Sequence, residues 1–145
     1  MTVYEMGIIY SGVPLVYKSY DEGKRFDPVL RSGFITALNT FASEAFSDEI
    51  EAFSMKKYNV VLLSHQVSQG EPGKILIIYA IGDKKLNKKV VTKALKSVLN
   101  AFLTKYVGFE LTSIDNRDFE EFETEFDKLM GDITKDPRDR LRSVF

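Results

Sequence analysis

The most restrictive feature of this sequence is an unbroken run of apolar and aromatic residues at positions 75–81, Ile-Leu-Ile-Ile-Tyr-Ala-Ile. Loop-forming residues flank the run, at positions 68–73 and 82–87. A short run that is apolar at both odd and even positions predicts a β-strand buried on both faces. Such a strand lies at the centre of a sheet, and the sheet then needs helices on both sides.

The remaining apolar periodicities and turn residues predict five strands and three helices in the order ββαβββαα. The predicted strands are residues 3–10, 13–20, 50–55, 58–67 and 75–81, and the predicted helices are residues 28–46, 88–107 and 115–130. Short connections favour antiparallel pairing of all five strands. We expect one α+β domain at residues 1–131, followed by a charged tail at residues 132–145.

Local signals support several of these boundaries. Ser11-Gly12 between two β-prone runs predicts a tight hairpin. Pro14 lacks an amide donor, so either the second strand lies at a sheet edge or Pro14 lies outside the ladder. Asp27 is a favourable N-cap, and Pro28 suits the first helical position. The sequence therefore predicts a helix that begins at Pro28 and ends near residue 46.

The first helix carries a wide apolar arc. One stripe, expected to pack on the sheet, consists of Leu30, Phe34, Ala37, Leu38, Phe41 and Ala45. Ile35, Ala42 and Phe46 widen the stripe to about half of the helix circumference, which is more than one packed face needs.

The other two helices have narrower apolar lines. The buried line of the second helix is predicted to be Val91, Leu95, Val98 and Phe102. The line of the last helix is predicted to be Phe119, Phe122, Phe126 and Leu129.

Composition excludes several classes of protein. The chain has no cysteine, so disulfides, thiolate metal sites and cysteine nucleophiles are excluded. A net charge of −1 provides no general attraction to nucleic acid. The sequence shows no apolar run of ~20 residues, no signal peptide and no lipidation motif. We expect a cytoplasmic protein whose membrane contacts, where it has any, are peripheral.

The predicted element order resembles that of the longin domain, a SNARE-like and profilin-like fold. The resemblance covers roughly residues 1–131 and includes the opening hairpin, the helix after Asp27, the three-strand meander and the helix from Lys88. Residues 108–111, Gly-Phe-Glu-Leu, leading into the last helix, are also similar to the end of the small sigma subunits of clathrin adaptors. A chain that begins with a strand is closer to longin domains than to roadblock domains or profilins.

The resemblance implies a five-stranded antiparallel sheet with one helix on one face and two on the other. It also implies a non-enzymatic adaptor in membrane trafficking or small-GTPase regulation. The implied partners are a small GTPase, a tethering or adaptor subunit, or a SNARE-like segment. Because no heptad segment or anchor follows the domain, the layout resembles free-standing sedlin-like or sigma-like subunits.

No set of residues in the sequence indicates a catalytic site. His65 is the only histidine, and it follows Ser64 on a predicted strand, so their side chains point to opposite faces. Nucleotide-binding, hydrolase and zinc-protease motifs are missing from the sequence. We expect no catalytic residue, cofactor or metal.

Two surfaces are candidate partner sites. Longin domains hold partner segments in a groove between the first helix and the third strand, which the resemblance places at Ile35, Ala42, Phe46 and Phe53. One alternative is that these side chains complete the core or are covered by the C-terminal tail. Another is a homodimer made through the same helix or edge strand.

The second surface is a basic patch around the start of the second helix. Its residues are Lys84, Lys85, Lys88, Lys89, Lys93 and Lys96, with no acidic residue between Asp83 and Glu110. Such a patch suits an anionic membrane or an acidic partner, and the alternative is an ordinary solvated helix face. The acidic residues of the last helix are interpreted as a solvated face.

Two other functions remain open. The first is a small-molecule sensor or enzyme subunit on a similar α/β sandwich, for which the sequence offers only Tyr10, Ser64, His65 and Tyr79 as pocket residues. The second is a roadblock-like homodimeric scaffold.

Overall fold

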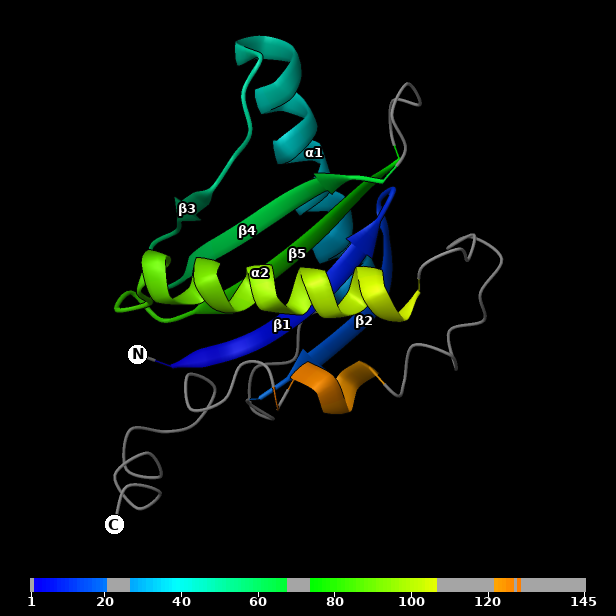
Figure 1. The fold of residues 1–145 in the computed structure, drawn as a ribbon. Coiled ribbons are helices and arrows are strands. Elements are labelled where there is room, and N and C mark those ends of the chain that lie inside the picture. Colours follow the sequence, from blue (N-terminus) through cyan, green and yellow to red (C-terminus); the bar gives the residue numbers. More distant parts are fainter. Residues whose placement is uncertain (1, 21–26, 68–73, 107–121, 127, 129–145) are drawn as a thin grey trace.

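The computed structural model describes residues 2–20, 27–67, 74–106, 122–126 and 128. The order of elements is the predicted one, and Figure 1 shows their arrangement. The strands are β1 (Val3–Tyr10), β2 (Val13–Ser19), β3 (Ala52–Ser54), β4 (Asn59–Gln66) and β5 (Ile75–Gly82), and the helices are α1 (Pro28–Phe46) and α2 (Lys88–Lys105). Residues 122–126 are also helical and lie within the last predicted helix.

The five strands form one antiparallel sheet in the order β2-β1-β5-β4-β3. The predicted α+β class and the five-stranded antiparallel sheet are therefore confirmed. Strand β2 is an edge strand, one of the two arrangements predicted from Pro14, and the register shifts where Pro14 pairs with Ile9. The hairpin turn has φ of 48° at Ser11 and 85° at Gly12, a left-handed pair that suits a two-residue hairpin.

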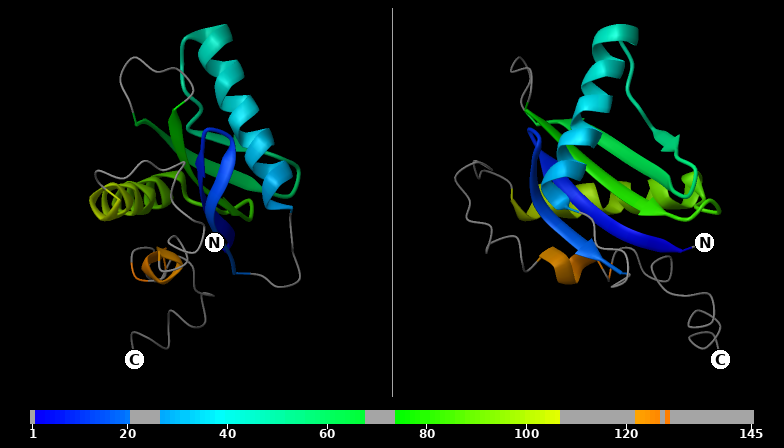
Figure 2. Two further views of the ribbon diagram at one scale, coloured as in Figure 1. Left: turned by 90° about the vertical axis from the view of Figure 1, so that its right-hand side faces the viewer. Right: turned by 180° about the vertical axis from the view of Figure 1, so that it is seen from behind.

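Strand β5 is the central strand, and both of its faces are buried as predicted. Its residues alternate between two apolar clusters. Leu76, Ile78 and Ala80 belong to the cluster beneath α2, whereas Ile77, Tyr79 and Ile81 belong to the cluster beneath α1. The side view in Figure 2 shows α2 and residues 122–126 on one side of the sheet and α1 on the other.

Helix α2 packs as its sequence predicted. Val91, Leu95, Val98 and Phe102 are each fully buried, and they contact the sheet cluster. Phe122 and Phe126 complete the same cluster, and the Phe122 ring lies edge-on to Phe102 with centroids 5.3 Å apart. The predicted contacts of Phe119 and Leu129, and the boundary between domain and tail, lie outside the described residues.

Helix α1 packs on the sheet with a different face from the one that the sequence predicted. Its bounds and caps are those expected, but its buried residues are Arg31, Ser32, Ile35 and Asn39. The apolar stripe predicted to pack on the sheet points away from it. Leu30 is 73% exposed and Phe41 is 64% exposed. The prediction was wrong because periodicity locates an apolar stripe, whereas the residues that the sheet offers decide which face of the helix turns inward.

Candidate functional site

Both ends of α1 are fixed by caps. The Asp27 side chain accepts hydrogen bonds from the backbone N–H groups of Val29 and Leu30, at 2.9 and 3.3 Å. At the other end, Ser47 adopts φ of 52° and its N–H donates to the carbonyl of Ser43. Capped ends give the helix defined bounds, so its orientation on the sheet depends on what its inner face meets.

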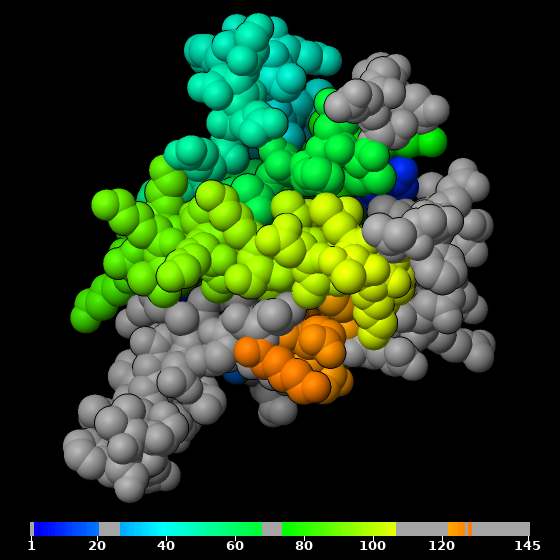
Figure 3. Space-filling view, in the orientation of Figure 1, coloured from blue at the N-terminus to red at the C-terminus, as the bar shows by residue number. Residues whose placement is uncertain are grey.

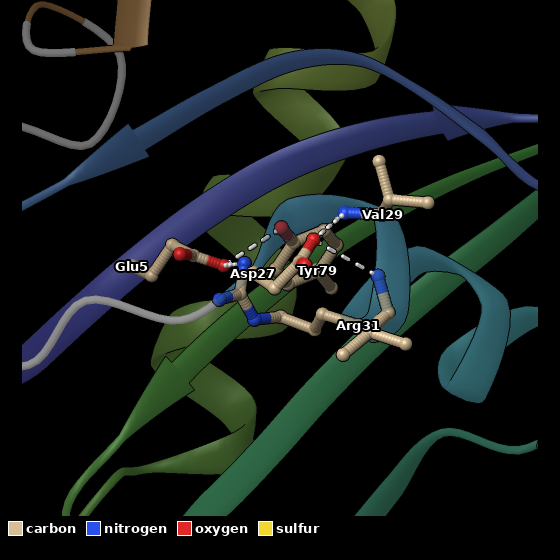
Figure 4. A network of polar contacts seen from close by, with 6 residues as sticks. Glu5, Asp27, Val29, Arg31 and Tyr79 are labelled. Atoms are coloured by element: carbon tan, nitrogen blue, oxygen red, sulfur yellow. Dashed lines mark hydrogen bonds and ion pairs between the residues drawn. The ribbon is translucent and has the colours of Figure 1, made fainter.

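The inner face of α1 meets a carboxylate. Glu5 on β1 is 1% exposed, and it forms an ion pair with the Arg31 guanidinium of α1. The Tyr79 hydroxyl of β5 donates a hydrogen bond to the same Glu5 oxygen, at 2.8 Å. Figure 4 shows the three side chains converging between the helix and the sheet. Three elements that are distant in sequence are thereby joined at one buried oxygen.

Burial governs the ionisation of this network. Burial raises the pKa of Glu5, while the Tyr79 hydrogen bond and the Arg31 charge oppose that rise. Burial and the neighbouring Glu5 charge raise the pKa of Tyr79 well above its usual range. Tyr79 is therefore a stable hydrogen-bond donor, and we assign the network a structural role in holding α1.

The apolar stripe of α1 faces away from this network, toward solvent. We define the α1 stripe as Leu30, Phe34, Ala37, Phe41 and Ala45. All five residues are exposed, and the exposed fractions of the two rings are 50% for Phe34 and 64% for Phe41. In the view from behind in Figure 2, α1 lies in front of the sheet and no other described element covers it. Large apolar side chains gathered in this way are typical of a protein-interaction surface.

Two aromatic contacts extend the stripe. The Phe34 ring lies edge-on to Phe53 of β3, with centroids 5.9 Å apart. Near the C-terminal end of α1, Phe41 lies edge-on to Phe46 at 6.5 Å. Phe46 is itself 72% exposed. The exposed apolar surface therefore runs along α1 and reaches the edge strand β3.

The groove predicted from sequence is only partly assembled. Ile35 was placed in the groove, but it is 1% exposed and belongs to the core beneath α1. Ala42 is half-buried, Phe53 packs partly against the same core, and Phe46 is exposed. Sequence reasoning missed Leu30, Phe34 and Phe41 as surface residues, because it assigned their stripe to the core.

The six lysines of the predicted basic patch are all exposed, and they lie around the start of α2. The Lys84 ammonium donates to the carbonyl of Met55 at 2.8 Å, and Lys88 pairs with Glu51. Lys88, Lys89, Lys93 and Lys96 border a shallow hollow of about 330 Å³. Whether this patch binds an anionic partner stays a prediction.

A polar pocket of about 520 Å³ lies between the C-terminal half of α1 and the end of β4. It is bordered by Asn39 and Glu44 of α1 and by Ser64 and His65 of β4, among others. The Asn39 Oδ1 and Ser64 Oγ atoms are buried without a hydrogen-bond partner within the described residues. Of the four residues expected to line such a pocket, Tyr79 belongs to the Glu5 network and Tyr10 to the core beneath α2.

Among the described residues, no group of three or more histidine and acidic side chains is placed to hold a metal ion. In the same part of the chain, no helix combines the length and apolarity needed to cross a bilayer. No protein-family model matches this sequence, and a search of curated proteins also finds no match.

Proposed function

We propose that this chain is a non-enzymatic adaptor or scaffold domain that binds partner proteins through the α1 stripe. The observation that carries the proposal is the exposure of large apolar side chains on a helix whose polar face is buried. Leaving Leu30, Phe34 and Phe41 in water costs free energy that a docked partner recovers.

We further propose a longin-like fold and a cytoplasmic role in membrane trafficking or small-GTPase regulation. The strand order β2-β1-β5-β4-β3 and the placement of α1 opposite α2 support the longin resemblance. In such a protein the α1 stripe and Phe53 replace the groove expected between the first helix and the third strand.

The basic patch adds a peripheral contact to this proposal. Lys89, Lys93 and Lys96 are exposed on α2, which lies on the side of the sheet opposite α1 (Figure 2) and forms much of the face shown in Figure 3. A cluster of this kind attracts an anionic lipid surface, so a membrane and a protein partner can be held at the same time. Reversing the charge of Lys89, Lys93 and Lys96 together should abolish co-sedimentation with phosphatidylserine vesicles, and unchanged co-sedimentation would contradict this part of the proposal.

The protein-docking role is tested by affinity capture from lysate of the source organism, with GDP and with a non-hydrolysable GTP analogue. We expect a small GTPase or a tethering subunit to be retained by the native chain and lost with Phe41→Asp. Val90→Asp is a matched control, since Val90 is 44% exposed on α2, across the sheet from α1. Retention of the same protein by Phe41→Asp would contradict docking through the stripe.

A small-molecule sensor is the second candidate, and the polar pocket beside Asn39 and Ser64 favours it. A volume of about 520 Å³ falls within the range of ligand sites. A thermal-shift screen against metabolites and nucleotides tests it. Saturable stabilisation that is lost with His65→Ala would support a sensor, and no saturable shift would remove this candidate.

A further inference from the structure

We infer that the α1 stripe is occupied in solution by the α1 stripe of a second copy, with the two helices antiparallel about a two-fold axis. This inference rests on the proposed function, because a second copy occupies the same surface in the purified chain, where no other partner is present. Most soluble homo-oligomers are symmetric, and a two-fold contact requires a patch that is complementary to itself. The stripe meets that requirement in its order of residues and its charge.

The order of residues is self-complementary. With the axis passing between Ala37 and Leu38, Phe34 of each copy lies opposite Phe41 of the other. In the same register Leu30 lies opposite Ala45, so a large side chain meets a small one at each end of the contact. Aromatic pairs at the two Phe34–Phe41 positions contribute beyond the area they bury. Every exposed apolar position of the stripe thus finds an apolar partner.

The charge of the helix permits this contact. Arg31 and Glu44 are the only charged residues within α1, and Arg31 is turned inward to Glu5. Glu44 lies near the end of the helix, so in the antiparallel register the two copies of Glu44 are about 20 Å apart at ~1.5 Å per residue. The contact therefore buries no charge at its centre and places no like charges side by side. Charge depletion at the centre is typical of protein interfaces.

The exposed apolar area sets the expected strength of the dimer. The large exposed residues of the stripe are Leu30, Phe34 and Phe41, with exposed fractions between 50% and 73%. With ~150–250 Å² for each aromatic side chain and less for Leu30, they expose on the order of 350 Å² per copy. The exposed small residues Ala37 and Ala45 supply further area and allow close approach of the helices. A standard interface buries about 800 Å² per partner, so we expect a weaker, reversible dimer.

The first measurement is sedimentation equilibrium of the purified chain, residues 1–145, over a series of concentrations. We expect a reversible dimer, and we expect Phe41→Asp to raise its dissociation constant at least about 100-fold, because the charge enters the centre of the contact twice. Val90→Asp, on α2, should leave the dissociation constant unchanged. A native chain that remains monomeric at about 100 μM, a weak-interaction limit of roughly 5 kcal/mol, overturns the inference.

Cysteine cross-linking tests the geometry, and it does not depend on whether the Asp variant folds well. The chain has no cysteine, so any disulfide that forms must involve the introduced cysteines. Ala37→Cys lies beside the proposed axis and should form a disulfide-linked dimer on mild oxidation. Ala45→Cys should not, because its two copies lie about 22 Å apart in the antiparallel register. The double variant Leu30→Cys with Ala45→Cys should cross-link again.

The outcomes separate this inference from the proposed function. Cross-linking through Ala45→Cys alone, or its failure through Ala37→Cys in a dimeric chain, overturns the antiparallel contact. A monomeric chain whose stripe captures a different protein, with loss of capture in Phe41→Asp, overturns the inference and leaves the proposed function standing. A dimer that persists in Phe41→Asp overturns the inference as well, because its contact then lies elsewhere.

Discussion

Substituting Gly7 by alanine should test the network that holds α1. Gly7 lies opposite Tyr79 in the pairing of β1 with β5. A Cβ atom at position 7 would lie 2.5 Å from the Tyr79 hydroxyl oxygen and 2.6 Å from two ring carbons. Tyr79 is 1% exposed and bonded to Glu5, so its ring cannot move away without losing that hydrogen bond or displacing its buried neighbours. The missing side chain of Gly7 is what allows Tyr79 to reach Glu5.

The expected loss has two parts. Overpacking of a close-packed core costs about 1–3 kcal/mol. Displacing the ring also breaks its hydrogen bond to a carboxylate, which is worth about 1.5–3 kcal/mol. Gly7→Ala should therefore lower the free energy of unfolding by about 2.5–6 kcal/mol, a large share of the ~5–15 kcal/mol typical of a domain.

Equilibrium unfolding in guanidinium chloride, at one protein concentration for all variants, measures the loss. Gly33→Ala is the matched control, since no heavy atom lies within 4 Å of its added Cβ atom. Alanine is a better helix former than glycine, so this change should stabilise the chain by about 0.5–1 kcal/mol. Adding Tyr79→Phe should cost less in the Gly7→Ala background than in the native chain, because the hydrogen bond is already lost. A loss below about 1 kcal/mol for Gly7→Ala would refute the reasoning.

Two further predictions concern the same network. Arg31→Leu should lower the free energy of unfolding by about 3–5 kcal/mol, because it leaves the Glu5 carboxylate buried without its cation. Adding Glu5→Gln should recover part of that loss in a double-mutant cycle, and strictly additive losses would contradict the coupling. Burial raises the pKa of Glu5 above its ordinary value of 4.5, so the folded state takes up this proton at a higher pH than the unfolded state. This contribution to stability is fully present below about pH 4.5 and is lost as the pH rises through the folded-state pKa. Denaturation at several pH values should show a flatter profile for Glu5→Gln, and a profile identical to that of the native chain would contradict the prediction.

Much of the fold could be predicted from the sequence, because its signals are local. The apolar run at residues 75–81 predicted a central strand, and Ser11-Gly12 predicted the hairpin turn. Asp27 and Pro28 fixed the start of α1. Each of these depends on a few neighbouring residues and on backbone preferences. The short strand β3 was predicted too long, since the structure pairs only Ala52–Ser54.

The orientation of α1 could not be predicted in the same way. It depends on Glu5 and Tyr79, which are 74 positions apart and meet only in the folded sheet. The sequence does contain an unused signal. Glu5 is the only charged residue in the strand at residues 3–10, and a buried carboxylate requires a cation or hydrogen-bond donors. Arg31, Ile35 and Asn39 follow one another at intervals of four on the helix, which marks a second, polar candidate for the inner face.

The buried network and the exposed stripe are two consequences of one choice of helix orientation. Turning α1 by half a revolution would bury Phe34 and Phe41, and it would carry Arg31 out to solvent. Glu5 would then remain beneath the helix without its cation, and removing one partner of a buried pair costs about 3–5 kcal/mol. This cost favours the orientation in which Arg31 packs inward and the apolar face is left outside. We expect Glu5 in this way to influence both the packing of the helix and the position of the surface that we propose docks a partner.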